Sequence, residues 1–394
     1  MRQTDGFGPT LHRLRIAEGL TLSQLARQVH YSKGYLSKIE HGLKQPSIEL
    51  ARQCDILLNA NGALTALTTP PTIETKDSSW QVSCRQTLGA EASSLFSNTS
   101  NHVDPAMLTF FQSSLQNLRL LGQTAPPDLV LPLIITQTNT LREITQQVSE
   151  PARVKLLSLC ARFAEYAGWM AQELGDDRAA LWWTGQAVDL AAAGQDHEVE
   201  SYALVRRALV AFYRGDAAQT ITLAHRALTS DTTRRIRGLA GLREAQGHAL
   251  AGDHYACSRA LDRARDLLAI DDGSKPMLGS ANLPDSVAMV TGWCLYDLGR
   301  PREAAEVLDV QCGRLRAHAW RNQARYGIRR ARAHAANGEI EHACALTQGL
   351  LDPLNSVQSA TVRTDLRRLI RTLCRFRTNS SVRALYPSLI ASIY

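Results

Sequence analysis

The chain has 394 residues, of which 44% are hydrophobic and 21% are charged, a balance close to that of soluble globular proteins. This composition excludes wholly disordered and fibrous proteins, and the length exceeds what one hydrophobic core usually serves, so two or three domains are expected. The formal net charge of +7 is compatible with nucleic-acid binding without requiring it.

Membrane insertion, secretion and metal binding find little support in the sequence. The best apolar run, residues 129–135, is far shorter than the ~20 residues of a membrane span, and Pro132 interrupts it. The N-terminus lacks the apolar segment of a secretory signal. No two of the eight cysteines lie within four residues of each other, so no CxxC metal or redox motif is present. We therefore expect a cytoplasmic protein without a metal site or a cofactor.

Composition separates three regions of the chain, and the helical pattern divides the last of them into repeats and capping helices. Residues 1–67 show dense helical patterning, and residues 68–103 are rich in Ser and Thr, which is typical of a linker. Helical repeats are predicted over residues 104–355 and capping helices over residues 356–394. Residues 1–67 hold 8 Lys and Arg against 5 Asp and Glu, and residues 360–394 hold 7 Arg against 1 Asp. The positive charge therefore lies at the two ends of the chain.

The first segment is predicted to form four helices and a short fifth helix over residues 63–67. Thr21, followed three residues later by Gln24, is a capping box that begins the second helix. Ser32 is a good N-cap for the third helix, which is predicted to end near Gly42.

The string LTLSQLARQVHYSKGYLSKIEHGLKQPS, residues 20–47, resembles the phage-repressor-like (Xre-type) helix-turn-helix. This resemblance implies that the third helix lies in the major groove of double-stranded DNA. The family often has Gly in the turn where His30 stands, and His tolerates the left-handed conformation better than most residues. The residues that the resemblance assigns to DNA binding are Ser32, Lys33, Tyr35, Ser37, Lys38, His41 and Lys44. The alternative is a helical bundle that binds protein, but polar and cationic groove-facing positions favour DNA.

Glycine-containing turns recur every 37 to 47 residues after residue 104, each between two segments with helical periodicity. The turn glycines are Gly175, Gly215, Gly252, Gly299 and Gly338. A small residue stands seven positions before each of them, at Gly168, Ala208, Ala245, Gly292 and Ala331. This register resembles the tetratricopeptide repeat, in which small residues let paired helices approach closely. An irregular helical bundle is the alternative.

In tetratricopeptide arrays the concave surface is lined by the first helix of each repeat, at positions six and three before the small residue and one and four after it. The candidate ligand-binding residues chosen from this set are Arg162, Trp169, Tyr202, Phe212, Gln246, Trp293, Tyr296, Arg325 and Arg332. Aromatic and cationic side chains together suit a peptide or an amphipathic small molecule, and Arg325 and Arg332 are the best candidates to hold a carboxylate. The alternative is that Trp169 and Trp293 only pack between successive repeats.

The helix predicted over residues 356–377 has an apolar face, and arginines follow each other at i, i+4 along another face. The arginines are Arg363, Arg367, Arg371 and Arg375. Either the apolar face caps the solenoid beneath a solvated arginine stripe, or this terminal pair of helices dimerises.

The whole chain resembles an actinobacterial-style transcriptional regulator, all-α, with a repressor-type DNA-binding head on tetratricopeptide repeats. The resemblance implies a homodimer that senses a peptide or small signalling ligand. A scaffold tethered to DNA, whose solenoid binds a partner protein, is the alternative. No GxSxG, GxxxxGK[ST] or HExxH motif occurs, and we expect no enzymatic activity.

Overall fold

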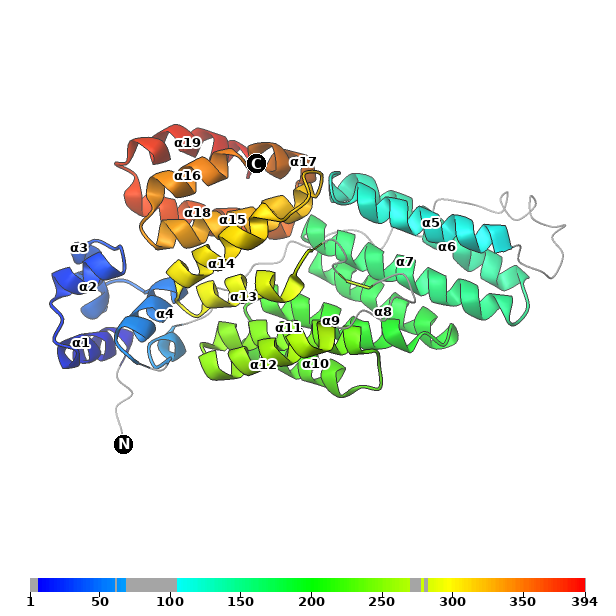
Figure 1. Ribbon diagram of the computed structural model, residues 1–394, viewed down its shortest axis with the longest axis horizontal. Coiled ribbons are helices and arrows are strands. Elements are labelled where there is room, and N and C mark those ends of the chain that lie inside the picture. The colour runs from blue at the N-terminus through cyan, green and yellow to red at the C-terminus, as the bar shows by residue number, and fades with distance from the viewer. Residues whose placement is uncertain (1–5, 61, 69–104, 270–277, 280–282, 394) are drawn as a thin grey trace.

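The computed structural model describes residues 6–60, 62–68, 105–269, 278–279 and 283–393, and every regular element within them is helical (Figure 1). The predicted all-α class, a helix-turn-helix head followed by a helical solenoid, is thereby confirmed. Among the described helices, none has the length and hydrophobicity of a membrane span. The linker predicted over residues 68–103 lies, apart from Thr68, outside the described residues.

The head contains four α-helices and a single turn of 3₁₀ helix. They are α1 (Phe7–Ala17), α2 (Leu22–Gln28), α3 (Lys33–Glu40), α4 (Ile48–Leu57) and η1 (Thr65–Leu67). The predicted capping box of Thr21 and Gln24 precedes α2, and His30 takes the left-handed conformation with φ of 53°. The predicted fifth helix is the short η1, and the Asp55 carboxylate accepts hydrogen bonds from the backbone N–H groups of Leu64 and Thr65 at its start.

The remainder of the chain folds as consecutive helix pairs, as the repeat pattern predicts. The pairs are α5 (Pro105–Leu121) with α6 (Pro127–Gln147), α7 (Ala152–Leu174) with α8 (Asp177–Ala193), α9 (His197–Tyr213) with α10 (Ala217–Thr229), α11 (Arg234–Ala251) with α12 (His254–Leu268), α13 (Ser286–Asp297) with α14 (Pro301–Gly313), and α15 (Trp320–Ala336) with α16 (Ile340–Gln348). All five predicted turn glycines have φ between 80° and 89°, a conformation that favours glycine.

The small residues before these turns are tightly packed, as their spacing predicts. Ala208, Ala245 and Ala331 are fully buried. A Cβ atom at Gly292 would stand 2.7 Å from Leu308 Cγ, so nothing larger than glycine fits there without displacement. The close approach of paired helices therefore depends on these positions.

The end of the chain departs from the single helix predicted over residues 356–377. It forms α17 (Leu351–Val357), α18 (Ala360–Leu373), the 3₁₀ turn η4 (Cys374–Phe376) and α19 (Ser380–Ala391). Gln358 has a positive φ of 42° and separates α17 from α18, which Ser359 caps. The apolar face of α18 is buried among the last helices, at Val362, Leu366, Leu369, Ile370 and Leu373. It therefore caps the solenoid and is not available to a second copy.

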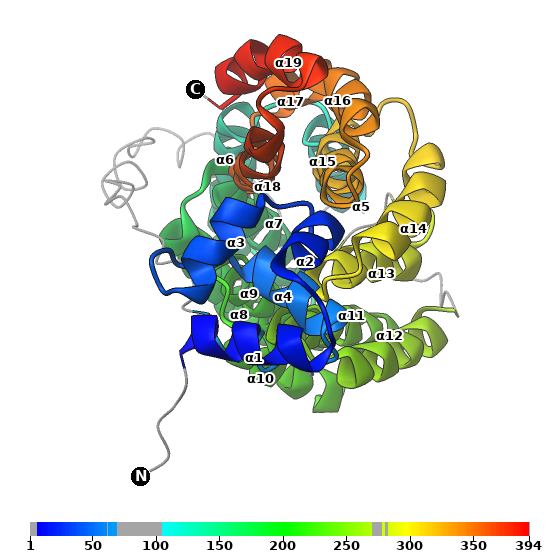
Figure 2. The same cartoon turned by 90° about the vertical axis from the view of Figure 1, so that its left-hand side faces the viewer.

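The solenoid closes on itself at the buried carboxylate of Glu173, at the end of α7. Glu173 is 0% exposed and pairs with Arg325 and, at 2.8 Å, with Arg321, both from α15. It also accepts hydrogen bonds from Ser359 (2.5 Å) and Thr361 (2.9 Å) around the start of α18. The last helices thus return to α7, and Figure 2 shows α18 beside α7 behind the head.

Candidate nucleic-acid interface and ligand pocket

The third helix of the head presents an exposed polar surface. Ser32 caps α3 by accepting a hydrogen bond of 3.2 Å from the Tyr35 backbone N–H. Lys33 and Lys38 are exposed on α3, and Ser37 is half-buried. These two ammonium groups are free to meet DNA bases or phosphates.

Two further polar groups follow α3. His41, which ends the helix, is exposed, and its Nδ1 lies 2.7 Å from the Ser37 carbonyl oxygen. Lys44 is exposed, and its Nζ lies 4.8 Å from the centre of the Tyr35 ring. That ring in turn stacks on Tyr31 with 5.3 Å between centres, which fixes its direction. All seven residues assigned to DNA binding therefore lie on or beside α3.

A buried ion pair fixes α3 against α1. Arg15 donates to both carboxylate oxygens of Glu40, at 2.7 and 3.0 Å, and to the Leu20 carbonyl oxygen at 2.8 Å. Burial would raise the pKa of Glu40, but the hydrogen bonds from Arg15 and His12 outweigh it, and the pKa is lowered. The two-pronged geometry holds the end of α3 in a defined orientation.

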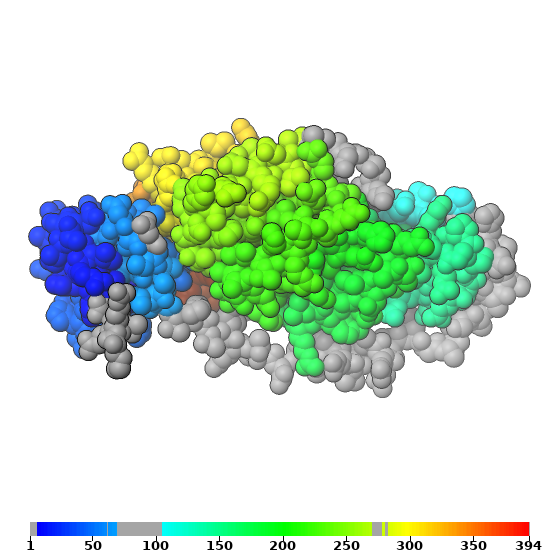
Figure 3. Space-filling view, turned by 90° about the horizontal axis from the view of Figure 1, so that it is seen from below, coloured from blue at the N-terminus to red at the C-terminus, as the bar shows by residue number. Residues whose placement is uncertain are grey.

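The head is docked on the solenoid through α4 and the turn before α3, a contact that the sequence did not suggest. Arg52 of α4 donates to Asp297 at 3.3 Å and to the Leu250 carbonyl oxygen at 2.7 Å. Arg332 donates to Glu49 of the same helix at 2.8 Å. The guanidinium of Arg375, which is part of η4, lies 4.2 Å from the centre of the Tyr31 ring. Figure 3 shows the head at one end of the molecule, against the repeats.

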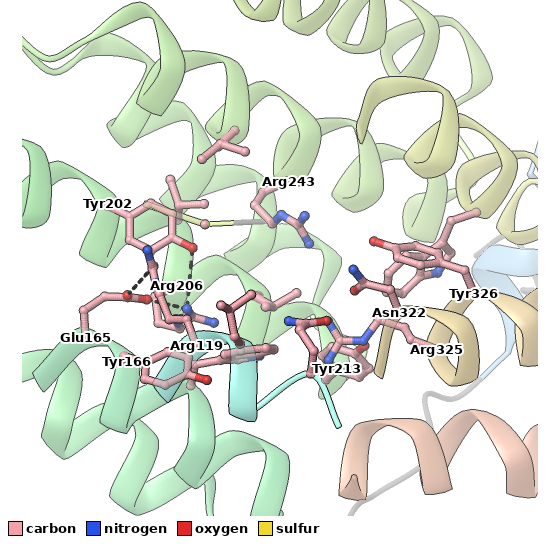
Figure 4. A pocket seen from close by; sticks show the side chains of 18 of the residues that line it. Arg119, Glu165, Tyr166, Tyr202, Arg206, Tyr213, Arg243, Asn322, Arg325 and Tyr326 are labelled. Carbon is pink, nitrogen blue, oxygen red and sulfur yellow. Dashed lines mark hydrogen bonds and ion pairs between the residues drawn. The ribbon is translucent and has the colours of Figure 1, made fainter. Parts of the chain in front are cut away.

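A second candidate site is a cavity of about 380 Å³ lined by residues of α5, α7, α9, α11, α13 and α15 (Figure 4). Its size lies within the range of small-molecule sites. Aromatic side chains form much of its wall, namely Tyr166, Trp169, Tyr202, Tyr213, Trp293 and Tyr326. The charged residues at its surface are Arg119, Glu165, Arg206, Arg243 and Arg325.

The structure places the nine predicted ligand-binding residues in three different settings. The residues that line the cavity are Trp169, Tyr202, Trp293 and Arg325. Phe212 packs edge-on against Trp293 with 5.1 Å between ring centres, and Gln246 is fully buried. The other three residues lie outside the cavity. Arg162 pairs with Asp196 and Glu198. Arg332 binds Glu49 of the head, and its guanidinium lies 4.2 Å from the centre of the Tyr296 ring.

The two arginines expected to hold a ligand carboxylate both hold a carboxylate of the chain. Arg325 pairs with Glu173, and Arg332 pairs with Glu49. The repeat spacing predicts that both side chains lie on the inner face of α15. It does not predict which acidic residue pairs with each of them. The closure of the solenoid and the docking of the head supply those partners.

Other cavity residues escaped the sequence analysis, although the repeat register could have found several. Tyr166, Arg206 and Arg243 each stand two residues before the small residue of their helix. That position is one turn after the one occupied by Tyr202, and therefore shares its face of the helix. Arg119 comes from α5, outside the counted repeats, and carries no such signal.

Comparison with known proteins identifies the first of the two regions. Residues 7–67 match the family model described as a helix-turn-helix domain. No curated protein matches the chain in sequence. Among solved structures, the chain is similar to a Rap protein complexed with competence and sporulation factor, at 12% identity and a TM-score of 0.46, over 76% of this chain and 89% of that chain. The N-terminal segment, residues 7–67, is therefore a helix-turn-helix domain.

Proposed function

We propose that the chain is a cytoplasmic, sequence-specific DNA-binding transcriptional regulator with no enzymatic activity. In this proposal the head is of the repressor (Xre) type, and the repeats are tetratricopeptide-like and bind a peptide or small signalling ligand. The observation that carries the proposal is the exposed surface of α3, where Lys33 and Lys38 stand on a helix braced by the Arg15–Glu40 pair. An interface for another protein would be expected to show apolar side chains at these positions.

The pocket and the docked head share two helices, which supports the proposed sensing. On α13, Trp293 lines the cavity, and Asp297, one turn later, receives Arg52 of the head. On α15, Arg325 lines the cavity, and Arg332, two turns later, binds Glu49 of the head. At 1.5 Å per residue these steps are about 6 and 10 Å along the helix axes. A ligand that shifts either helix would therefore act directly on the contacts of the head.

Ligand binding can alter DNA binding only through a difference in affinity between two positions of the head. The concave cavity, with its aromatic and polar lining, favours a ligand over the alternative of a scaffold for a partner protein, which would call for a broad exposed surface. We propose that the regulator acts as a homodimer, because one head makes few base contacts and paired half-sites are read about 34 Å apart. The buried apolar face of α18 is excluded as the dimer contact.

The test begins with selection of an operator from a random duplex library by the full chain. Gel shifts on that operator should then show at least a tenfold loss of affinity for the double variant Lys33→Ala/Lys38→Ala. Lys155→Ala, which removes an exposed lysine from α7, is the matched control and should bind like the wild type. Equal affinity of the double variant and the control would refute the proposed DNA-binding surface. Light scattering of the same sample measures the oligomeric state.

A further inference from the structure

The arginines of the cavity differ in whether the chain neutralises them. Arg206 pairs with Glu165, and Arg119 lies 3.7 Å from the same carboxylate. Arg325 pairs with Glu173. Three of the four cavity arginines therefore have an acidic partner from the chain itself.

Arg243 of α11 is the exception. Within the described part of the chain, its guanidinium forms no hydrogen bond and no ion pair. The groups whose charges act on it most are Tyr326, Tyr202, Tyr213 and Arg325, none of them a carboxylate. Figure 4 shows its side chain directed into the cavity, with no dashed line to any residue drawn. Burial lowers the pKa of Arg243, because its surroundings disfavour the charged guanidinium.

A second polar group at the same cavity also lacks a partner. Asn322 of α15 is 9% exposed, and its side-chain amide makes no hydrogen bond with any residue that the structure describes. Buried polar groups in folded proteins are nearly always hydrogen-bonded, and a buried charge is nearly always paired. Arg243 is half-buried, and the polar atoms of Arg243 and Asn322 remain accessible from the cavity, so a molecule that fills it has to supply their hydrogen-bonding partners.

The walls define the rest of that molecule. Trp169 and Trp293 both line the cavity and offer aromatic surface to it, and tyrosines complete the wall. The available 380 Å³ accommodates a compact molecule, far smaller than a folded partner. The planar guanidinium of Arg243 offers two parallel N–H donors, an arrangement that matches a carboxylate.

We propose that this cavity binds a compact organic monoanion with an apolar, preferably aromatic body, and that its carboxylate pairs with Arg243 and accepts a hydrogen bond from Asn322. This assignment rests on the proposed function and narrows it by naming the chemical class of the signalling ligand. Arg243 is the anchoring residue, and the aromatic walls hold the body of the ligand.

The test uses two dyes that share an aromatic body and differ by one anionic sulfonate group. 8-Anilinonaphthalene-1-sulfonate is an aromatic monoanion, and N-phenyl-1-naphthylamine has the same body without the sulfonate. Fluorescence titration of the full chain should give at least tenfold tighter binding of the anionic dye. Arg243→Gln should abolish this preference by weakening only the anionic dye. Arg237→Gln, an exposed arginine on the same helix, should keep the preference.

Three further readouts make the result decisive. The thermal midpoint of Arg243→Gln should equal or exceed that of the wild type, because an unpaired charge is removed. 1-Naphthoate should displace the anionic dye at lower concentration than naphthyl phosphate. Any one of three results would overturn the assignment. These are a wild type that shows no preference between the dyes, an Arg243→Gln variant that retains the preference, and displacement of the anionic dye by naphthyl phosphate at lower concentration than by 1-naphthoate. The Lys33→Ala/Lys38→Ala variant should bind both dyes like the wild type. The dye titration therefore tests the cavity, and the gel shift tests the DNA-binding surface, so either proposal can fail without the other.

Discussion

Arg332 of α15 donates a hydrogen bond of 2.8 Å to Glu49 of α4, although 283 residues separate them in the chain. Burial would raise the pKa of Glu49, but the Arg332 charge beside it outweighs that effect and lowers the pKa to about 2. The same guanidinium covers the Tyr296 ring, 4.2 Å from its centre. The pair is thus ionised at neutral pH, and it connects the helix-turn-helix head to α15, one of the helices that line the cavity.

A double-mutant cycle should show strong coupling across this contact. Glu49→Ala and Arg332→Ala should each lower the free energy of unfolding, since either change leaves a poorly solvated charge without its partner, and the double variant should cost less than their sum. We expect a coupling energy of roughly 1–3 kcal/mol from urea unfolding. The exposed pair Arg302 and Glu306, whose side chains are 80% and 63% exposed, is the control and should couple by less than about 0.5 kcal/mol. Similar coupling in both pairs would contradict the docked arrangement.

The turn glycines allow a second test of docking. Gly299 and Gly215 have φ of 82° and 80°, so alanine should introduce a similar backbone strain of about 1–2 kcal/mol at either position. A Cβ at Gly299 would also stand 2.5 Å from the Arg52 carbonyl oxygen of the head, whereas nothing lies within 4 Å of one at Gly215. We expect Gly299→Ala to accelerate hydrogen exchange in α4, and Gly215→Ala to leave α4 unchanged. If α4 exchanges its amide hydrogens at the same rate in both variants, the head does not rest on this turn.

Local features of this fold were predictable, because each depends on residues close together in the chain. The capping box of Thr21, the left-handed His30 and the glycine turns of the repeats all follow from short-range rules of backbone conformation. Four cavity residues followed from the repeat register, since helices of similar length present equivalent positions to the same side.

Closure and docking were not predictable, because they depend on which charges meet across long separations. Glu173 gives no sign in the sequence that it meets Arg321, 148 residues later. The repeat register predicts that Arg332 binds a ligand, whereas in the docked structure Arg332 donates a hydrogen bond to Glu49 of the head. Periodicity determines the face on which a side chain lies, but the partner comes from the tertiary arrangement.

DNA binding should respond differently to salt in two lysine variants. If Lys44 contacts phosphate, Lys44→Ala should weaken binding to all sequences alike and reduce the slope of log affinity against log salt by about one unit. Lys38→Ala, in the groove, should cost about 1–3 kcal/mol on the selected operator and much less on unrelated DNA. Fluorescence anisotropy at several salt concentrations separates the two effects, with Lys155→Ala as the reference. A Lys44→Ala variant with an unchanged slope would remove that residue from the phosphate contacts.

Acid should weaken the closure of the solenoid through Glu173. Burial would raise the pKa of this carboxyl, but the charges of Arg325 and Arg321 outweigh it and lower the pKa to about 2 from an ordinary value of 4.5. A carboxyl whose pKa is lower in the folded state stabilises the fold above its unfolded pKa, and that stabilisation is lost as pH falls towards the folded value. We therefore expect the free energy of unfolding to fall between about pH 4.5 and 2, with a contribution from Glu173 on the order of 3 kcal/mol.

Urea unfolding of the wild type and Glu173→Gln at pH 7, 5 and 3.5 measures this contribution. At pH 7 the variant should be less stable, because Arg321 and Arg325 lose the carboxylate that balances them in a fully buried site. Between pH 5 and 3.5 the wild type should lose more stability than the variant, in which the titrating group is gone. Glu306→Gln, which changes an exposed carboxyl of α14, should follow the wild-type pH dependence. If Glu173→Gln instead shows the full wild-type loss on acidification, the ionised form of Glu173 does not close the solenoid, and α18 must be held to α7 by its apolar contacts alone.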